Sequence, residues 1–131
     1  MPTISKEFHF SVSHQLAYLP NDHQCARLHG HNYVLAIELD AEPVELTDAG
    51  FVRDYGELDD FKKWIDRTLG HRHLNDVLTE VNSSAENIAI WIFEMWSRKI
   101  PELTAVRVSE TPKTWAEFRP REHRGSARRG S

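Results

Sequence analysis

The 131-residue sequence contains a single cysteine, Cys25, and no run of about 18 consecutive apolar residues. One cysteine cannot form a disulfide within the chain, which excludes a disulfide-stapled fold and fits a reducing cytoplasm. The missing apolar run excludes a membrane-spanning helix. The first ten residues include Lys6, Glu7 and His9 where a secretion signal needs an apolar stretch. We therefore expect a cytoplasmic protein with no membrane partner.

The chain is 40% apolar and 27% charged, an ordinary composition for a folded domain. Its net charge of −4 is unevenly distributed: residues 119–131 carry five arginines and one acid, whereas residues 1–118 carry 19 acids and 11 bases. An acidic body argues against nucleic acid as a partner. We predict one folded domain at residues 1–118 and a disordered basic tail at residues 119–131, with an RNA-binding arm as the alternative for the tail.

Hydrophobic periodicity predicts strands at residues 4–14, 33–39 and 103–111, and a further short strand fits residues 114–118. It also predicts two helices. One spans residues 58–69 and stops at Gly70, and the other opens with a cap at residues 83–86 and ends at Pro101. This order is typical of an α+β fold with an antiparallel sheet and two helices on one face. The open edges of so small a sheet favour pairing with other subunits.

Histidine is unusually frequent, with eight copies. His29 and His31 lie two residues apart, which on a strand puts both on one face, and Gly30 between them lets the backbone bend. If the first two strands pair antiparallel, His14 at the end of the first strand comes close to this pair. Three neutral imidazoles with one open position form the ligand set of a catalytic zinc site. Three unrelated surface histidines are the alternative.

Cys25 lies four residues before His29, in a polar, turn-like segment. No second cysteine is present to form the pairs typical of a structural zinc site, which favours a catalytic thiol over a metal ligand or a buried small hydrophobe. His71 and His73, which follow the helix stop, are candidates for the partner base of this thiol.

Six short motifs follow one another along the chain. They are Phe8-x-Phe10-x-x-x-His14, Cys25-x-x-x-His29-Gly30-His31-Asn32-Tyr33, Gly50-Phe51-Val52-x-Asp54-Tyr55, His71-x-x-Leu74-Asn75, Ser84-x-Glu86-Asn87 and Glu110-Thr111. Together, over about residues 4 to 118, they resemble the 6-pyruvoyl-tetrahydropterin synthase family. The three residues between Cys25 and His29 are similar to the spacing in the bacterial 6-carboxytetrahydropterin synthases of queuosine biosynthesis.

The resemblance implies the tunnelling fold, or T-fold, in which two helices pack on a four-stranded antiparallel sheet. It also implies that three subunits form a barrel and that two trimers stack into a homohexamer. The active sites would then lie between subunits.

The same resemblance assigns a role to each motif residue. Zn²⁺ would be held by His14, His29 and His31, and protons would be moved by Cys25 and His71. The pterin ring would be anchored by Glu110, with Thr111 beside it and with Ser83 and Ser84 lining the pocket. The implied activity is that of a carbon–carbon and carbon–oxygen lyase. It converts 7,8-dihydroneopterin triphosphate to 6-carboxytetrahydropterin, acetaldehyde and triphosphate.

One position departs from the family pattern. Where the family has Leu-Asp-His at the end of the first helix, this chain has Leu69-Gly70-His71, so the aspartate that would orient the histidine is missing. Another acid, such as Asp54 or Asp76, can take that role, or the enzyme is slow, or the pterin pocket serves another purpose. The alternatives are therefore a 6-pyruvoyl-tetrahydropterin synthase-like lyase and a low-activity or non-catalytic pterin-binding homologue.

Overall fold

The structure is a computed structural model that describes residues 1–14, 29–70, 72–73, 78 and 82–120. For residues 12–14, 29–31 and 72–73 it describes the backbone alone. Cys25, His71 and Asp76 lie outside the described residues, as do residues 121–131 of the expected tail.

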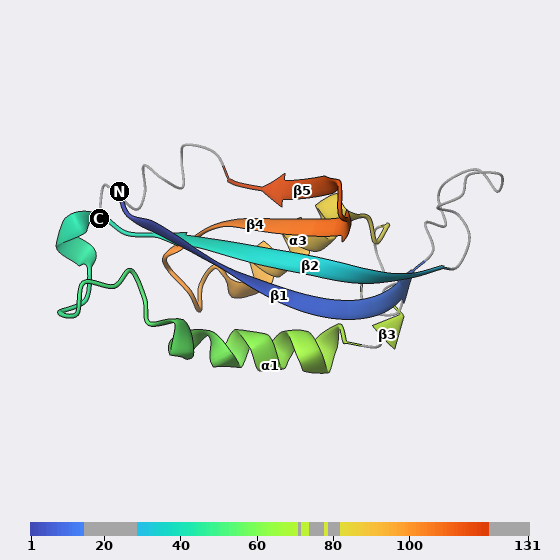
Figure 1. Cartoon of the computed structure of the whole chain (residues 1–131), viewed down its shortest axis with the longest axis horizontal. Helices are drawn as coiled ribbons and strands as arrows, with labels where there is room; N and C mark the ends of the chain where they lie inside the picture. Colours follow the sequence, from blue (N-terminus) through green and yellow to red (C-terminus); the bar gives the residue numbers. More distant parts are fainter. Residues whose placement is uncertain (15–28, 71, 74–77, 79–81, 121–131) are drawn as a thin grey trace.

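Five strands form one sheet in the order β3-β1-β2-β4-β5 (Figure 1). Their bounds are Thr3–His14 for β1, His29–Asp40 for β2, Arg72–His73 for β3, Leu103–Thr111 for β4 and Thr114–Phe118 for β5. The four longer strands pair antiparallel, which confirms the expected four-stranded sheet. The two-residue β3 pairs parallel to β1 and adds one more strand at that edge. A pattern of two residues is too short to be recognised in the sequence.

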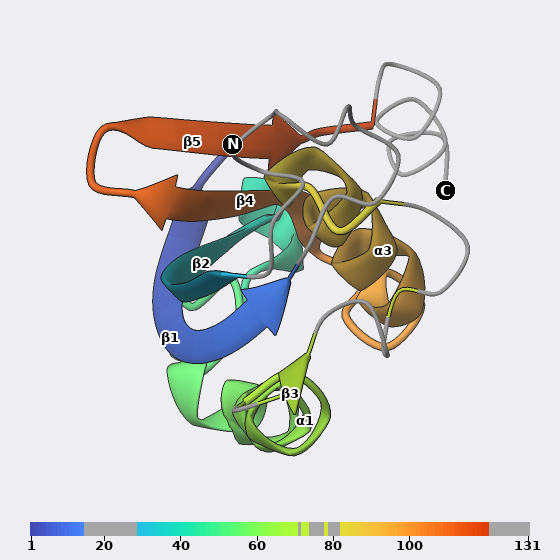
Figure 2. The same cartoon turned by 90° about the vertical axis from the view of Figure 1, so that its right-hand side faces the viewer.

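Two α-helices lie on one face of the sheet, as expected (Figure 2). Helix α1 is Asp59–Thr68, directly preceded by the 3₁₀ helix η3, Tyr55–Leu58, and helix α3 is Ala85–Trp96. A second 3₁₀ helix, η2, is Pro43–Glu45. Within the described ranges, no helix has the length and apolar character needed to cross a bilayer.

The end of α3 differs from the expectation. Regular helix ends at Trp96 rather than at Pro101, and one further turn follows, in which the N–H groups of Lys99 and Ile100 both bond to the Trp96 carbonyl. Ile100 is buried, so this turn directs the chain back into the core before Pro101 is reached. The proline therefore follows a bend that the burial of Ile100 has already produced.

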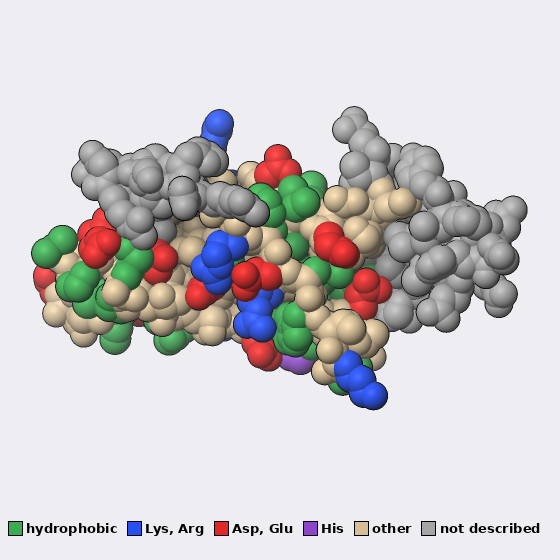
Figure 3. Space-filling model, turned by 90° about the horizontal axis from the view of Figure 1, so that it is seen from above, with side chains coloured by type: hydrophobic (Ala, Val, Ile, Leu, Met, Phe, Trp, Pro, Cys, Tyr) green, Lys and Arg blue, Asp and Glu red, His purple; other side chains and the backbone are tan. Residues whose placement is uncertain are grey.

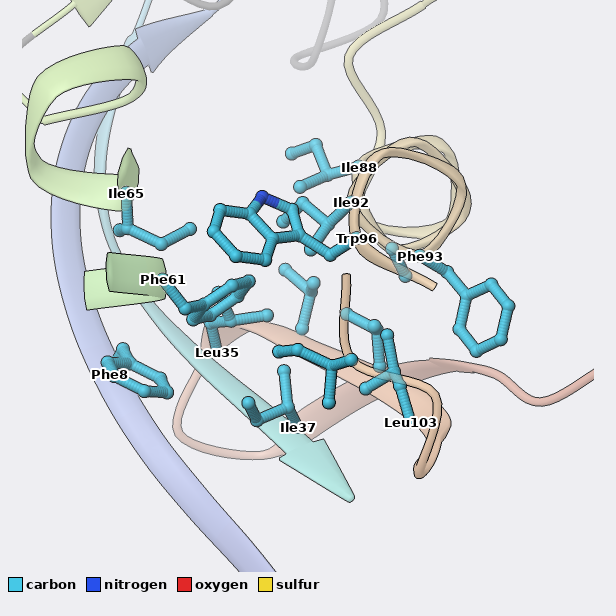
Figure 4. Close-up of a cluster of buried hydrophobic side chains, with 14 of the residues drawn as sticks. Phe8, Leu35, Ile37, Phe61, Ile65, Ile88, Ile92, Phe93, Trp96 and Leu103 are labelled. Carbon is cyan, nitrogen blue, oxygen red and sulfur yellow. The ribbon is translucent and has the colours of Figure 1, made fainter. Parts of the chain in front are cut away.

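The core lies between the sheet and the two helices, and Phe61 of α1 is near its centre (Figure 4). The Phe61 ring lies 5.0 Å from that of Phe8 on β1 and 5.1 Å from that of Trp96 on α3, both edge to face. This side chain therefore joins three elements that are far apart in the sequence. Full burial of such a side chain stabilises the fold by about 1.5–3 kcal/mol.

The other face of the sheet is polar. Arg119 pairs with Glu38 of β2 and with Glu117 of β5, and Glu117 also lies 3.8 Å from Arg107 of β4. Burial by itself lowers the pKa of Arg119, but hydrogen bonds to Glu117 and Glu38 raise it on balance. Seen from the β5 side, acidic and basic side chains lie next to one another in the middle of the molecule (Figure 3). Arg119, the first residue of the expected tail, thus forms ion pairs with side chains of the sheet.

Candidate active site

The three histidines predicted to bind zinc occupy neighbouring register positions at one end of the β1–β2 ladder. His14 pairs with His29, and Val12 pairs with His31. Residues directly opposite in an antiparallel pair share a face, and so do residues two apart on one strand. All three positions therefore share one face, the face on which Phe8 and Phe10 are buried against the helices. The expected antiparallel pairing is confirmed, while the metal-binding role remains a prediction.

Two pairs of side chains support the strands next to these positions. Phe10 and Tyr33 stack with ring centroids 5.2 Å apart, and Tyr33 is fully buried. On the opposite face, the Ser11 hydroxyl donates to Oδ1 of Asn32 at 2.5 Å. No role at the site was predicted for these residues, although Asn32 and Tyr33 follow His31 in the motif. Their contacts hold the two strands in register where the histidines begin.

Strand β3 brings a third segment to the same end of the sheet. Arg72 pairs with Val12 and His73 pairs with Ser13, so the chain directly after position 71 runs alongside the last residues of β1. The predicted proton carrier at position 71 is therefore next in sequence to a strand that touches the histidine end of the sheet. The end of α1, the start of α3 and the end of β4 lie at this end too (Figure 1).

Gly70 closes α1 in a conformation with no room for a side chain. The N–H groups of Leu69 and Gly70 both bond to the Ile65 carbonyl, and a Cβ on Gly70 would lie 2.7 Å from the backbone oxygen of Asp66. Contacts below 3.0 Å are essentially never made by real Cβ atoms. The backbone at the end of α1 therefore accommodates only glycine at position 70, because every other residue carries a Cβ.

Asp54 does not replace the missing carboxylate within one chain. It caps η3, where its Oδ1 accepts a hydrogen bond from the Gly56 N–H at 2.9 Å. The ten residues of α1 separate it from Gly70, which corresponds to about 15 Å of helix. Of the two acids suggested by the sequence, Asp54 is thus at the wrong end of α1, and Asp76 lies outside the described residues.

Glu110, the predicted pterin anchor, is half-buried near the end of β4. The β4–β5 register shifts between Val108 and Thr111, which places Glu110 in a bulge. Bulges re-aim side chains and are common beside active sites. Thr111 is exposed, and its Oγ1 lies 2.8 Å from that of Thr114, so this hydroxyl holds the β4–β5 turn.

The two serines predicted to line the pterin pocket begin α3. Ser84 is the N-cap, and its hydroxyl accepts a hydrogen bond from the Asn87 N–H at 3.2 Å. The expected cap is therefore present, and Ser84 is the capping residue. Ser83, directly before the cap, is fully buried, and its role in lining a pterin pocket remains a prediction.

Comparisons with known proteins agree with these features. The sequence profile described as 6-pyruvoyl tetrahydropterin synthase matches residues 3–121. A 6-carboxy-5,6,7,8-tetrahydropterin synthase from Synechocystis is 33% identical over 119 residues, covering 88% of this chain and 91% of the relative. A dihydroneopterin monophosphate aldolase from Pyrococcus furiosus is 28% identical over 92 residues, covering 70% and 75%. The solved 6-pyruvoyl tetrahydropterin synthase of Caenorhabditis elegans superposes with a TM-score of 0.74 at 27% identity, covering 92% and 98%.

Proposed function

Because the chain belongs to the 6-pyruvoyl tetrahydropterin synthase family, we propose that it is a zinc-dependent 6-carboxytetrahydropterin synthase. It converts 7,8-dihydroneopterin triphosphate and one water molecule to 6-carboxytetrahydropterin, acetaldehyde and triphosphate. The observation that carries the proposal is the register of β1 and β2, which pairs His14 with His29 and places His31 two residues further along the same face. The 33% identity to a relative with that name supports this product over others.

The donor set at this end of the sheet suits zinc. Three histidine positions share one face, and neutral imidazole is a preferred zinc ligand. In the proposed site, His14, His29 and His31 would hold the ion. When bound, zinc supplies Lewis-acid chemistry. It makes the C–H and O–H protons at the two hydroxyl-bearing carbons of the substrate side chain easier to remove.

The remaining chemistry belongs to side chains of the chain itself. In the proposed mechanism, the Sγ of Cys25 takes and returns a proton at the substrate side chain, and a ring nitrogen of His71 exchanges protons with it. A thiol ionises closer to neutral pH than a hydroxyl, so it needs less help from a carboxylate behind the histidine. This difference makes turnover without an aspartate at position 70 chemically reasonable.

The Glu110 carboxylate has the right shape for one edge of a pterin. Its two oxygens accept hydrogen bonds from the adjacent ring N–H and amino group, an arrangement that is stronger because the acceptor is charged. The bulge in β4 around this residue lies at the same end of the sheet as the three histidine positions, which supports this role. In this proposal, Glu110 orients the ring and leaves the side chain of the substrate to Cys25 and His71.

The proposed assembly is a cytoplasmic homohexamer, a dimer of trimers with active sites between subunits. The short strands β3 and β5 form the two edges of the described sheet. Strand edges carry backbone groups that can pair with another chain, and joining sheets into a barrel satisfies them. Size-exclusion chromatography with light scattering would distinguish this assembly from a monomer.

The test is a product analysis. The zinc-loaded full chain is incubated with 7,8-dihydroneopterin triphosphate, and mass spectrometry identifies the pterin while a coupled dehydrogenase assay measures acetaldehyde. We expect 6-carboxytetrahydropterin and acetaldehyde in equal amounts. Formation of 6-pyruvoyl-tetrahydropterin would support the alternative lyase. Absence of product from zinc-loaded protein that still binds pterin would support a non-catalytic homologue, which Gly70 makes the second candidate.

A further inference from the structure

The residues that lead into α3, Asn82, Ser83 and Ser84, belong to neither a helix nor a strand. They lie at the histidine end of the sheet, and the two serines are predicted to line the pterin pocket. A segment without regular structure has no ladder of backbone hydrogen bonds to keep it in one conformation. Groups that bind a ligand nevertheless have to be held close to the geometry that binding requires. Another part of the chain therefore has to hold this segment.

Asn87, in the first turn of α3, makes two hydrogen bonds to the segment. Its backbone N–H donates to the Ser84 hydroxyl at 3.2 Å, and its side-chain Nδ2 donates to the main-chain carbonyl oxygen of Asn82 at 3.0 Å. The two bonds end on either side of Ser83, which is fully buried. One residue of the helix thus holds both ends of the segment.

Only the first of these bonds is an ordinary helix cap. A capping serine accepts a hydrogen bond from the N–H of the third helical residue, and every residue except proline would supply that N–H at position 87. The bond to Asn82 reaches two residues beyond the cap and uses one of the donors of a side-chain amide. The Asn87 side chain therefore has a role that helix capping does not explain.

The conformation of the segment carries a local energetic cost. Oδ1 of Asn82 is buried and makes no hydrogen bond within the described part of the chain. A buried acceptor without a partner is unfavourable, and native proteins contain few of them. The bonds from Asn87 oppose the relaxation that would bring this oxygen to water. Local costs of this kind are typical of segments shaped for function.

We propose that Asn87 is a positioning residue for pterin binding, which fixes residues 82–84 in the conformation that the pocket requires before the ligand arrives. The inference rests on the proposed function, in which Ser83 and Ser84 line the pterin pocket. Asn87 does not touch the pterin and acts through the Asn82 carbonyl and the Ser84 hydroxyl. A ligand that meets a segment already in place loses no binding free energy in ordering it.

The test measures how tightly the zinc-loaded full chain binds pterin itself, the ring system without the reactive side chain, by fluorescence well below the melting temperature. Asn87→Ala and Asn87→Asp both remove the Nδ2 donor. We expect each to weaken pterin binding about tenfold, because binding must then order the segment that the lost hydrogen bond held. Glu94→Ala, at an exposed position later in α3, is the control and should bind pterin as the unaltered chain does.

The two Asn87 variants separate positioning from folding. An acid in the first turn of a helix is favourable, so Asn87→Asp retains stability that Asn87→Ala loses. We expect the melting temperature to fall by about 3–5 °C in Asn87→Ala and to stay within about 2 °C in Asn87→Asp. With 7,8-dihydroneopterin triphosphate, both variants should raise KM about tenfold and leave kcat within about twofold, since Cys25 and His71 are unchanged. Zinc content should not change.

The proposal is overturned if both folded variants bind pterin as tightly as the unaltered chain, or if affinity falls only in the variant with the lower melting temperature. A fall in kcat at unchanged KM would overturn it as well. Failure of the proposed reaction gives a different result: the unaltered chain then binds pterin without forming 6-carboxytetrahydropterin, and the pterin affinities of the variants still decide the role of Asn87. An unaltered chain that binds no pterin would overturn both.

Discussion

The Gly70 backbone and the Asp66 carbonyl oxygen are so close that a Cβ on Gly70 would lie 2.7 Å from that oxygen. The position where the family carries an aspartate is thus closed to any side chain unless the end of α1 moves. The departure from the family motif is consequently a structural feature of the helix end as well as a chemical change. It bears directly on what restoring the aspartate would do.

We expect Gly70→Asp and Gly70→Ala to lower the free energy of unfolding by similar amounts, about 1–3 kcal/mol, because both add a Cβ against the Asp66 backbone. Neither should raise kcat. Thermal unfolding and steady-state kinetics of both variants provide the measurement. A higher kcat in Gly70→Asp but not in Gly70→Ala would show that the helix end relaxes and that the carboxylate helps the neighbouring histidine.

His29→Ala should abolish stoichiometric zinc binding, because it removes one of three ligands from the proposed site. His9→Ala is the matched control, since His9 is exposed and pairs with Val34 on the opposite face of the sheet. Metal content after dialysis, measured by mass spectrometry, distinguishes the two. Retention of one zinc per chain by folded His29→Ala would refute the ligand assignment.

Cys25→Ala should retain zinc and pterin binding and lose turnover, because the thiol is proposed to move protons and not to bind metal. General acid–base groups contribute about 10²–10⁴-fold to rate, so kcat should fall within that range. Metal content, pterin affinity and kcat are measured on the same preparation. Loss of zinc together with activity would instead make Cys25 a metal ligand.

Glu110→Gln should weaken pterin binding by about 10- to 150-fold, since hydrogen bonds to a charged group contribute about 1.5–3 kcal/mol. Glu117→Gln, on β5, changes a carboxylate that pairs with Arg107 and Arg119, and should leave pterin affinity unchanged. Isothermal titration calorimetry with a pterin that the protein binds but does not convert gives both affinities. Equal effects of the two variants would contradict a specific role for Glu110.

Ser84→Ala should lower the free energy of unfolding by about 1 kcal/mol through loss of the α3 cap, whereas Ser84→Thr should retain most of it. The measurement is chemical denaturation of both variants. If Ser84 also touches the pterin, Ser84→Ala weakens pterin binding beyond its effect on stability. Unchanged stability in Ser84→Ala would show that the cap is not needed for α3.

Much of the fold could be predicted because its signals are local. Alternation at Phe8 and Phe10 indicates a strand with one buried face, and the helical spacing of Phe61 and Ile65 indicates α1. The β4 and β5 bounds agree with the predicted residues 103–111 and 114–118. Strand β2 extends beyond the expected residues 33–39, because pairing with β1 continues through the polar histidine motif that hydrophobic periodicity does not register.

The candidate site was less accessible to sequence reasoning. The histidine spacing and the family motifs pointed to His14, His29 and His31, and the register then placed these positions together. The pairing of β3 with β1 has no periodic signal, since two residues make no pattern. The exclusion of a side chain at Gly70 depends on the Asp66 carbonyl four residues earlier, at a helix end whose geometry is settled by packing.

By itself, the sequence determined which residues alternate, which repeat at helical spacing and which motifs can supply imidazole, thiol and carboxylate groups. These are properties of residues close together along the chain, and they can be identified without knowledge of the fold. Only the tertiary structure decided that Asp54 is at the wrong end of α1 and that Glu110 lies in a bulge of β4. Those relationships depend on where α1 begins and ends and on how β4 pairs with β5, which the pattern of neighbouring residues does not specify.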